Sequence, residues 1–292
     1  MGASSGRATV RAGDDAGRAI PALFESHGAR VRALALKLCR NAADADDMMQ
    51  EVFLRAYRRW STFRGEADAG TWLYTIAARA CRDRLRRKGG IDRRMPAVSQ
   101  LMPWGETTVM AVAAAPEEHE AERHEAVARV QRAISDLPEH LRVPVIMKEV
   151  AGMSVEDTAR ALGLAENTIK TRLHRARLAL RKAMSAKARS VDAPAPIFDR
   201  QVCVDLLKAK MDAMDRGGAS AGLTVPKAEL CARCSAVFRE LDMVQSACEQ
   251  IGTGPVPERV RTLVLRELRA LEEQRAASPR RGRKPRAARA GI

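Results

Sequence analysis

The chain of 292 residues is long enough for two or three small domains, and its 51 Lys and Arg against 36 Asp and Glu give a formal net charge of +15. Aromatic residues make up only 3% of the chain and alternating Val, Ile and Thr runs are nearly absent, which argues against a substantial β-sheet. No apolar run approaches the roughly 20 residues of a membrane-spanning helix, and the N-terminus lacks the apolar core of a signal peptide. We therefore expect a cytoplasmic protein with an anionic partner, nucleic acid first and a membrane surface as the rival.

Helical patterning begins near Ile20 and is interrupted by polar segments rich in Gly and Pro, which mark loops and linkers. The periodicity between these breaks predicts an all-α fold of two small helical domains joined by a flexible linker, followed by a small helical C-terminal domain. The predicted boundaries are a disordered tail at 1–18, helical domains at 19–88, 125–188 and 201–274, linkers at 89–124 and 189–200, and a basic disordered tail at 275–292.

The stretch "DADDMMQEVFLRAYRRW" predicts an amphipathic helix with two different faces. One face collects apolar residues at helical spacing and belongs to a core. The other carries Asp47, Glu51 and Leu54, and an apolar leucine beside two carboxylates is typical of a docking surface for a basic partner helix. The alternative is a leucine that is exposed by chance.

The next predicted helix places Arg79, Arg82 and Arg86 along one side at one-turn spacing. A row of arginines of this kind suits a phosphate backbone. Just before it, "FRGEADAGTW" places a polar loop between Phe63 and Trp72, which fits the capture of an unstacked base. The alternative is that both aromatic residues belong to the core.

The stretch "SVEDTARALGLAENTIKTRLHRARLAL", residues 154–180, predicts two short helices around a tight turn. Ser154 is a good N-cap with Asp157 at the capping-box distance, and Gly163 permits the left-handed turn that ends the first helix. An apolar stripe is expected to bury the second helix against the first. The residues of this stripe are Ile169, Leu173, Ala176 and Leu180.

The opposite side of the second helix collects polar and basic side chains, namely Thr168, Thr171, Arg172 and Arg175. This is a helix-turn-helix arrangement, whose second helix enters the major groove with polar side chains toward the base edges. The residues expected to contact phosphates are Lys170, Arg177, Arg181 and Lys182. The alternative is a solvated amphipathic helix of some other bundle.

Both helical stretches resemble parts of one family, the bacterial extracytoplasmic-function sigma factors. "GMSVEDTARALGLAENTIKTRLHRARLALRK" is similar to the promoter-reading region 4 of this family, and "DADDMMQEVFLRAYRRWSTFRGEADAGTWLYTIAARACRDRLRRK" is similar to its region 2. The resemblance covers about residues 19–188 in the family's order, with region 2 at 19–88 and region 4 at 125–188.

The resemblance implies a protein that directs core RNA polymerase to specific promoters, with no catalytic residue of its own and no cofactor required for DNA binding. It implies that the clamp helices of the largest polymerase subunit bind Asp47, Gln50, Glu51 and Leu54. It assigns a flipped minus-ten base to the loop of Gly65, Glu66, Ala67 and Asp68, and the opened strand to Arg79, Arg82 and Arg86. It assigns the minus-thirty-five element to the hairpin, through Thr168, Lys170, Thr171, Arg172 and Arg175.

Four of the six cysteines follow residue 200, and Cys231 and Cys234 form a C-x-x-C pair that suits a metal knuckle or a redox dithiol. If Cys234 and Cys248 share one helix, their thiols lie about 21 Å apart along it and cannot bind one ion. Cys203 is therefore the better third ligand. The remaining two cysteines, Cys39 and Cys81, lie on apolar helix faces and are expected in the core.

The block "CVDLLKAKMDAMDRGGASAGLTVPKAELCARC" resembles the zinc-binding fold of anti-sigma domains, in which an early Cys or His joins a His-x-x-x-Cys-x-x-Cys motif. Here Lys227 stands where the histidine is expected, and no histidine follows His174. The candidate zinc ligands are Cys203, Cys231 and Cys234. A fourth would come from a water, a small thiol, or Asp199, Asp205 or Glu229. A redox pair and buried structural cysteines are the alternatives.

Anti-sigma-like helices in the same chain suggest regulation. The C-terminal block would cover the polymerase-facing or DNA-facing surfaces until a metal, thiol or oxidant changes its fold. A separate anti-sigma factor is left open as a further partner. A stand-alone helix-turn-helix regulator fits the arginine row and the acidic-apolar face less well, and a thiol oxidoreductase would need a strand before its C-x-x-C pair.

Overall fold

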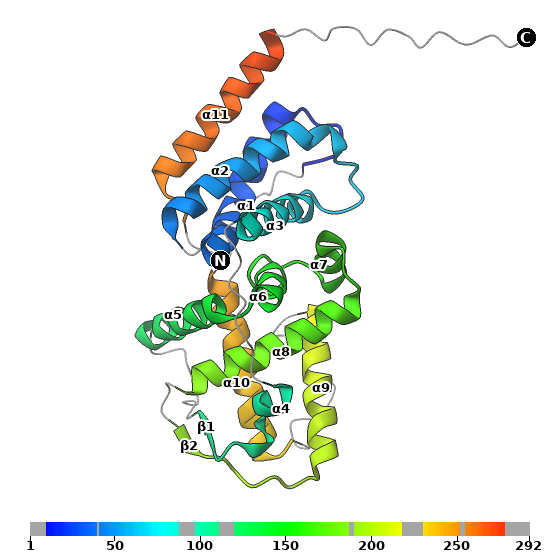
Figure 1. Ribbon diagram of the computed structural model, residues 1–292, viewed down its shortest axis with the longest axis vertical. Helices are drawn as coiled ribbons and strands as arrows, with labels where there is room; N and C mark the ends of the chain where they lie inside the picture. The colour runs from blue at the N-terminus through cyan, green and yellow to red at the C-terminus, as the bar shows by residue number, and fades with distance from the viewer. Residues whose placement is uncertain are drawn as a thin grey trace, which may run out of the picture.

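The computed structural model describes residues 10–39, 41–87, 97–110, 120–186, 190–217, 230–251 and 255–277. The molecule is elongated and almost entirely helical in these ranges (Figure 1). One end holds α1, α2, α3 and α11, the middle holds α5, α6 and α7, and the other end holds α4, α8 and α9, with α10 running from that end to the middle (Figure 1). The predicted all-α fold is confirmed. Among the described residues, no helix is both long and apolar enough to cross a membrane.

The first helical domain consists of α1 (Ala16–Cys39), α2 (Ala42–Arg59), the 3-10 turn η1 (Trp60–Thr62) and α3 (Ala69–Arg87). Its apolar faces meet in one core, in which Phe24 and Phe53 pack edge to face with ring centroids 4.9 Å apart. Asn41 caps α2, because its side-chain oxygen accepts from the backbone N–H of Asp44.

The segment before the first domain corrects the predicted disordered tail at 1–18, since residues 10–18 are ordered and α1 begins at Ala16 rather than near Ile20. The Asp15 carboxylate accepts from the backbone N–H of Gly17 and satisfies the first turn. The indole N–H of Trp60 donates to the carbonyl of Asp14 over 2.6 Å. These contacts hold the segment against the domain.

The second domain consists of α5 (Glu120–Asp136), α6 (Glu139–Val145), the π-helical turn η4 (Ile146–Val150), α7 (Val155–Leu162) and α8 (Glu166–Ser185). Pro144 has no N–H to donate, and the wide turn η4 follows it directly. The helix α7 packs against α3, and η4 against α1. The two domains are therefore in direct contact with each other (Figure 1).

The predicted linker at 89–124 is folded where the structure describes it, which is a second correction. It forms α4 (Val98–Leu101), the 3-10 turn η2 (Pro103–Gly105) and the strand β1 (Thr108–Met110), and α5 already begins at Glu120. The strand β2 (Ser190–Asp192), from the predicted linker at 189–200, pairs antiparallel with β1, with Val109 opposite Val191. Burial of Leu101, Val109 and Met110 explains why this segment folds.

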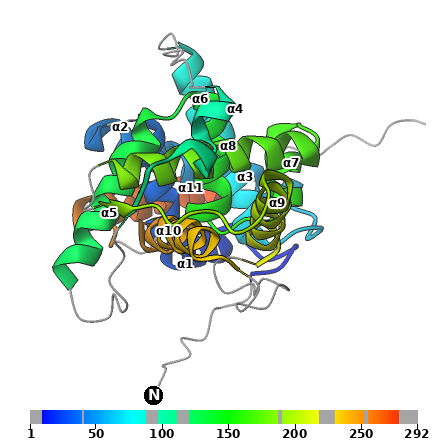
Figure 2. The same ribbon diagram turned by 90° about the horizontal axis from the view of Figure 1, so that it is seen from below.

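The C-terminal extension consists of α9 (Arg200–Gly217), α10 (Ala232–Ile251) and α11 (Glu258–Ala277). The helix α10 packs against α5, α8, α9 and η4, and α11 packs against α2 and α1. Figure 2, which views the molecule from below, shows α9 and α10 side by side at the end opposite α11. The core of the two domains continues without a break into α10 and α11 through Val244, Cys248, Val264 and Leu268. The extension is thus packed onto both domains.

Candidate nucleic-acid interface

The predicted helix-turn-helix is present in α7 and α8, with the predicted caps. The backbone N–H of Asp157 donates to the Ser154 hydroxyl over 2.9 Å, and Gly163 ends α7 with φ of 66°. The predicted apolar stripe is fully buried, at Ile169, Leu173, Ala176 and Leu180. The sequence therefore predicted this hairpin correctly down to its caps.

The polar face of α8 remains accessible at its N-terminal half. Thr171 is exposed, and the other residues predicted to read DNA are half-buried, namely Thr168, Lys170, Arg172 and Arg175. The Thr171 hydroxyl donates to the carbonyl of Asn167 one turn earlier. This half of the helix thus presents the mixture of hydroxyl and basic groups that base edges and phosphates accept.

Arg177 and Arg181 do not lie on that face, and their predicted phosphate contacts are wrong. The Arg177 side chain is 1% exposed, and its guanidinium donates to Glu149 over 2.6 Å and to Asp215 of α9 over 2.6 Å. Burial alone would lower the pKa of Arg177, but the two carboxylates outweigh it and raise this pKa above its ordinary value. Both ion pairs hold the arginine inside the protein, away from any phosphate.

Arg181 is buried in the same way one turn later. Its guanidinium donates to Glu240 of α10 over 2.7 Å and also to Glu106, which lies in the predicted linker. Lys182 is exposed, and its ammonium donates to the carbonyl of Gln100. The C-terminal half of α8 is thereby enclosed by the linker and the extension.

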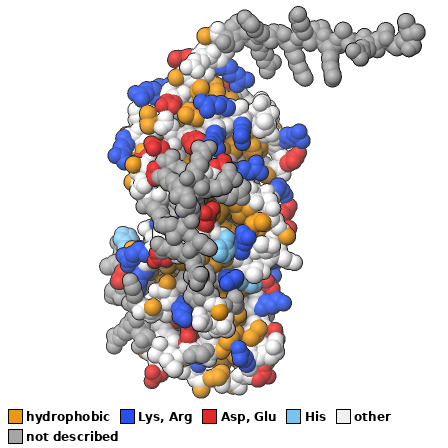
Figure 3. Space-filling view, in the orientation of Figure 1, with side chains coloured by type: hydrophobic (Ala, Val, Ile, Leu, Met, Phe, Trp, Pro, Cys, Tyr) orange, Lys and Arg blue, Asp and Glu red, His pale blue; other side chains and the backbone are white. Residues whose placement is uncertain are grey.

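The predicted strand-binding elements of α3 are only partly described. Arg79 is exposed on α3, whereas the side chains of Arg82 and Arg86 lie outside the described part of that helix. On the face seen in Figure 3, Lys and Arg side chains are spread over both ends of the molecule. The prediction of an arginine row therefore stays a prediction.

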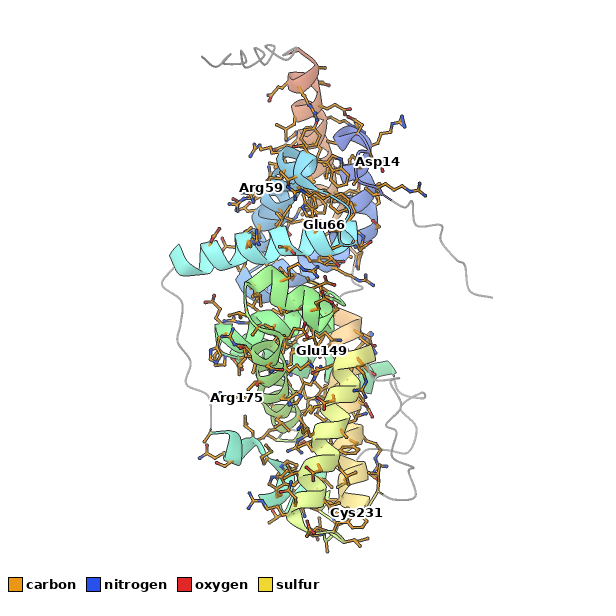
Figure 4. All side chains as sticks on the ribbon, turned by 90° about the vertical axis from the view of Figure 1, so that its right-hand side faces the viewer. Asp14, Arg59, Glu66, Glu149, Arg175 and Cys231 are labelled. Atoms are coloured by element: carbon orange, nitrogen blue, oxygen red, sulfur yellow. The ribbon has the colours of Figure 1, made fainter. Side chains whose placement is uncertain are left out.

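The loop before α3 is open to solvent, as base capture requires. Gly65, Glu66 and Asp68 are exposed and Ala67 is half-buried, and Gly65 adopts φ of 75°. The Asp68 carboxylate accepts from the backbone N–H of Gly70, at the first turn of α3. Figure 4 shows Glu66 at the α1–α3 end of the molecule, far from Cys231.

Phe63 and Trp72 flank the loop as members of an aromatic cluster with Trp60. Trp60 stacks on Phe63 with ring centroids 5.0 Å apart, and Trp72 meets Trp60 edge to face at 5.5 Å. Phe63 is 9% exposed, which supports its structural interpretation, while Trp72 is half-buried. The cluster holds the loop in position.

The residues predicted to bind the polymerase lie on α2, which α11 contacts. Asp47 is exposed, and Gln50, Glu51 and Leu54 are half-buried. The neighbouring Asp46 is engaged by the extension, since Arg259 of α11 donates to its carboxylate over 2.8 Å. No local sequence pattern could predict this pairing, because 213 residues separate the two side chains.

The three candidate zinc ligands lie together, packed with the half-buried Trp104, Leu206 and Leu230. The thiol sulfurs of Cys203 and Cys234 are 3.9 Å apart, and the backbone N–H of Cys234 donates to the Cys231 sulfur over 3.4 Å. Two sulfurs bound to one zinc at about 2.3 Å lie about 3.8 Å apart in tetrahedral geometry, so the Cys203–Cys234 pair matches zinc, whereas the three sulfurs do not all lie within 4.8 Å of one another. Cys248 is fully buried in the main core instead.

Local interactions shift the pKa values of Cys231 and Cys234 in opposite directions. Burial alone would raise the pKa of the Cys231 thiol. Hydrogen bonding, with the backbone N–H of Cys234 as a donor, outweighs burial and lowers that pKa. Burial, followed by the Cys231 sulfur, raises the pKa of Cys234 to about 12. As for a fourth ligand, the Asp199 carboxylate, directly before α9, accepts from the backbone N–H of Val202, and the Asp205 carboxylate accepts from the side-chain amide of Gln201. Glu229 lies outside the described residues. Cys39 is half-buried, and the Cys81 side chain is outside the described part.

Comparison with known proteins places this geometry in context. Residues 23–91 match Sigma-70 region 2, and residues 128–180 match Sigma-70, region 4. ECF RNA polymerase sigma factor SigM of Mycobacterium tuberculosis is 35% identical over 158 residues, which cover 54% of this chain and 73% of that relative. RNA polymerase sigma-H factor of Pseudomonas aeruginosa is 30% identical over 175 residues, which cover 60% of this chain and 90% of that relative. A solved structure, CnrH in complex with the cytosolic domain of CnrY, has a TM-score of 0.41 at 22% identity, covering 59% of this chain and 94% of that chain.

Proposed function

The chain belongs to the ECF RNA polymerase sigma factors, and we propose that α2, α3 and α8 perform polymerase docking, strand capture and promoter reading, respectively. A sigma factor binds core RNA polymerase and directs it to promoters. The observation that carries the assignment is the helix-turn-helix of α7 and α8, preceded in the chain by the region 2 match. A stand-alone regulator is not favoured, because it would have no use for region 2.

In this proposal, Asp47, Gln50, Glu51 and Leu54 bind the polymerase clamp helices. The support for this assignment is that these four residues lie on one face of α2. This face combines an exposed carboxylate (Asp47) with a half-buried carboxylate, amide and leucine. The loop 65–68 receives a flipped minus-ten base, since it is exposed and held by the aromatic cluster. The N-terminal half of α8 reads the minus-thirty-five element.

The contact between the two domains leads to a further part of the proposal, that this closed arrangement is inactive. Minus-ten and minus-thirty-five elements are about 25 base pairs apart, which is about 85 Å along B-DNA at about 3.4 Å per base pair. Here α7 of the second domain packs directly on α3 of the first. The domains must therefore separate before both elements can be bound at once.

The C-terminal extension stabilises the closed arrangement, because it binds both domains. The helix α10 packs on α8, with Arg181 paired to Glu240, and α11 packs on α2, with Arg259 paired to Asp46. We infer that the extension acts as an inhibitor within the same chain. Core polymerase would have to displace α11 in order to reach the docking face of α2 fully.

The cysteine cluster is proposed to hold one zinc ion that joins α9 to α10. Cys203 comes from α9, Cys234 from α10, and Cys231 directly precedes α10, so an ion bound by all three would fix the two helices together. Zinc bound in such a site contributes directly to the folding free energy of a small domain. A disulfide formed within the cluster is the alternative, and it would replace the ion when the thiols are oxidised.

The function is tested by run-off transcription with purified core polymerase on genomic fragments, with and without the chain. We expect specific start sites that appear only with the chain. Asp47→Arg should reduce co-purification with core polymerase, whereas Glu258→Gln, at an exposed residue of α11, should leave it unchanged. Failure to stimulate any start site, together with failure to bind core, would contradict the function.

A further inference from the structure

A second cluster of metal-ligating side chains lies where the DNA-reading helix meets the extension, apart from the cysteines. His174 of α8 and Asp212 and Asp215 of α9 bring one ligand atom each to within 4.8 Å of one another. The imidazole Nε2 of His174 is 3.8 Å from Oδ2 of Asp215. These three residues form the His–Asp–Asp cluster.

The Asp215 carboxylate is the feature that calls for a ligand. Its side chain is only 4% exposed, and Oδ1 accepts from Arg177 over 2.6 Å. Its other oxygen, Oδ2, is buried and has no hydrogen-bond partner among the described residues, and neither has Nε2 of His174. These two atoms lie 3.8 Å apart, beyond hydrogen-bonding distance, so a cation bound between them would give both a partner.

The chemistry of the three donors selects the class of that group. One imidazole nitrogen and two carboxylate oxygens are ligands for first-row divalent transition metals such as Zn²⁺, Mn²⁺ or Co²⁺. Ligand atoms bound at about 2.1 Å lie about 3.4 Å apart in tetrahedral geometry, so a small rotation of the side chains closes the cluster. Burial lowers the pKa of His174, which favours the neutral imidazole that binds metals.

The neighbouring charges allow a cation at this place. Arg177 is the nearest fixed positive charge, and Glu149 accepts from both its Nε and its Nη2, at 3.0 and 2.6 Å. The charge of Arg177 is thus offset by Glu149. Lys170 is a second positive charge that acts on His174, and the two carboxylates of Asp212 and Asp215 outnumber it. The Arg177 contact also orients the Asp215 carboxylate, as outer partners do at metal sites.

We propose that His174, Asp212 and Asp215 bind one first-row divalent metal ion, which joins the DNA-reading helix α8 to α9 of the extension. The site needs no promoter and no polymerase in order to bind the ion. Its consequence rests on the proposed function: the ion would add to the Arg177–Asp215 pair in holding the closed arrangement. The extension would then hold a metal contact to α8 that is separate from the cysteine cluster.

The test measures Co²⁺ binding to the full chain after removal of metals with a chelator. In a variant with Cys203, Cys231 and Cys234 all changed to serine, we expect one Co²⁺ per chain, with ligand-field bands but no sulfur-to-cobalt charge-transfer band. Asp212→Asn in that background should lower the Co²⁺ affinity at least about tenfold, and His174→Gln should do the same. Glu249→Gln, at an exposed residue of α10, is the matched control and should change nothing.

If the serine variant loses its fold by circular dichroism, the unmodified chain is loaded with one equivalent of Zn²⁺, and a second equivalent of Co²⁺ is titrated instead. The same dependence on Asp212 is expected there. The proposal is overturned if Co²⁺ does not bind, if Asp212→Asn leaves its affinity unchanged, or if Mg²⁺ binds equally well, as it would to a simple acidic patch. Because the readout is metal binding, a failure of this proposal is distinguishable from a failure to support transcription.

Discussion

Arg181 of α8 and Glu240 of α10 form an ion pair of 2.7 Å with side chains that are 0% and 1% exposed. One turn earlier, Arg177 pairs in the same way with Asp215 of α9. Both arginines of α8 are thus held inside the protein, each between a carboxylate of the extension and a second carboxylate, Glu149 for Arg177 and Glu106 for Arg181. The position of the extension on this helix underlies the following predictions.

Glu240→Ala should destabilise the closed protein. Removing one partner of a buried ion pair costs about 3–5 kcal/mol, and since Glu106 still faces Arg181, we expect about 3 kcal/mol. Urea unfolding measures the change. Ser246→Ala, at an exposed position of the same helix, should change the free energy of unfolding by less than about 0.5 kcal/mol. Equal effects of the two variants would mean that the buried pair does not hold α10 on α8.

Lys170→Ala and Arg177→Ala should affect promoter binding differently. Loss of a phosphate contact at Lys170 should weaken binding by the polymerase complex and reduce the slope of log affinity against log salt by about 1. Arg177→Ala should leave that slope unchanged, because Arg177 is buried, and should lower the stability of the free protein instead. Promoter affinity measured at salt concentrations from about 50 to about 200 mM gives the slope for each variant and so separates the two effects. A reduced slope with Arg177→Ala would show that this arginine turns outward to reach DNA.

Gly163→Ala should weaken the helix-turn-helix. The residue at φ of 66° must adopt a left-handed conformation, which costs an ordinary L-residue about 1 kcal/mol. Gly163→Asn should cost less, because asparagine tolerates this conformation better. Thermal unfolding of both variants gives the comparison, and an alanine variant as stable as the parent would show that the turn can rearrange.

Zinc removal should loosen the end of the molecule that holds the cysteine cluster. We expect one zinc ion to be released when the protein is treated with a thiol-modifying reagent, and Cys231→Ser to hold one zinc ion fewer than the parent. Cys39→Ser should retain the zinc, since Cys39 lies on α1. Zinc content measured by elemental analysis is the readout. Equal zinc in Cys231→Ser and in the parent would leave the cluster with a redox or purely structural role.

The helices, the hairpin caps and the buried stripe of α8 were predictable, because they follow from spacings within a few residues. Ser154, Gly163 and Leu173 each act through neighbours that are close in sequence. The proximity of Cys203 to Cys234 was also predictable, since a single helix keeps Cys248 too far away. Whether the cluster binds metal stays a prediction.

The burial of Arg177 and Arg181 was not predicted, although both fall on the same side of α8 as Leu173 and Leu180. A basic residue in a basic chain was interpreted as a phosphate contact. Their partners are 28 to 75 residues away in sequence, so no local pattern pairs them. For the same reason, the folding of the linker around Glu106 could be recognised only in three dimensions.

We propose that the C-terminal extension holds this sigma factor in the closed arrangement. The most direct test is run-off transcription from one responsive promoter, with core polymerase and either the full chain or a chain that ends at Ala188. We expect the shorter chain to reach half-maximal transcription at a concentration at least about tenfold lower, within the range of typical coupling between sites. Equal activity of the two chains, or lower activity of the shorter one, would contradict the claim.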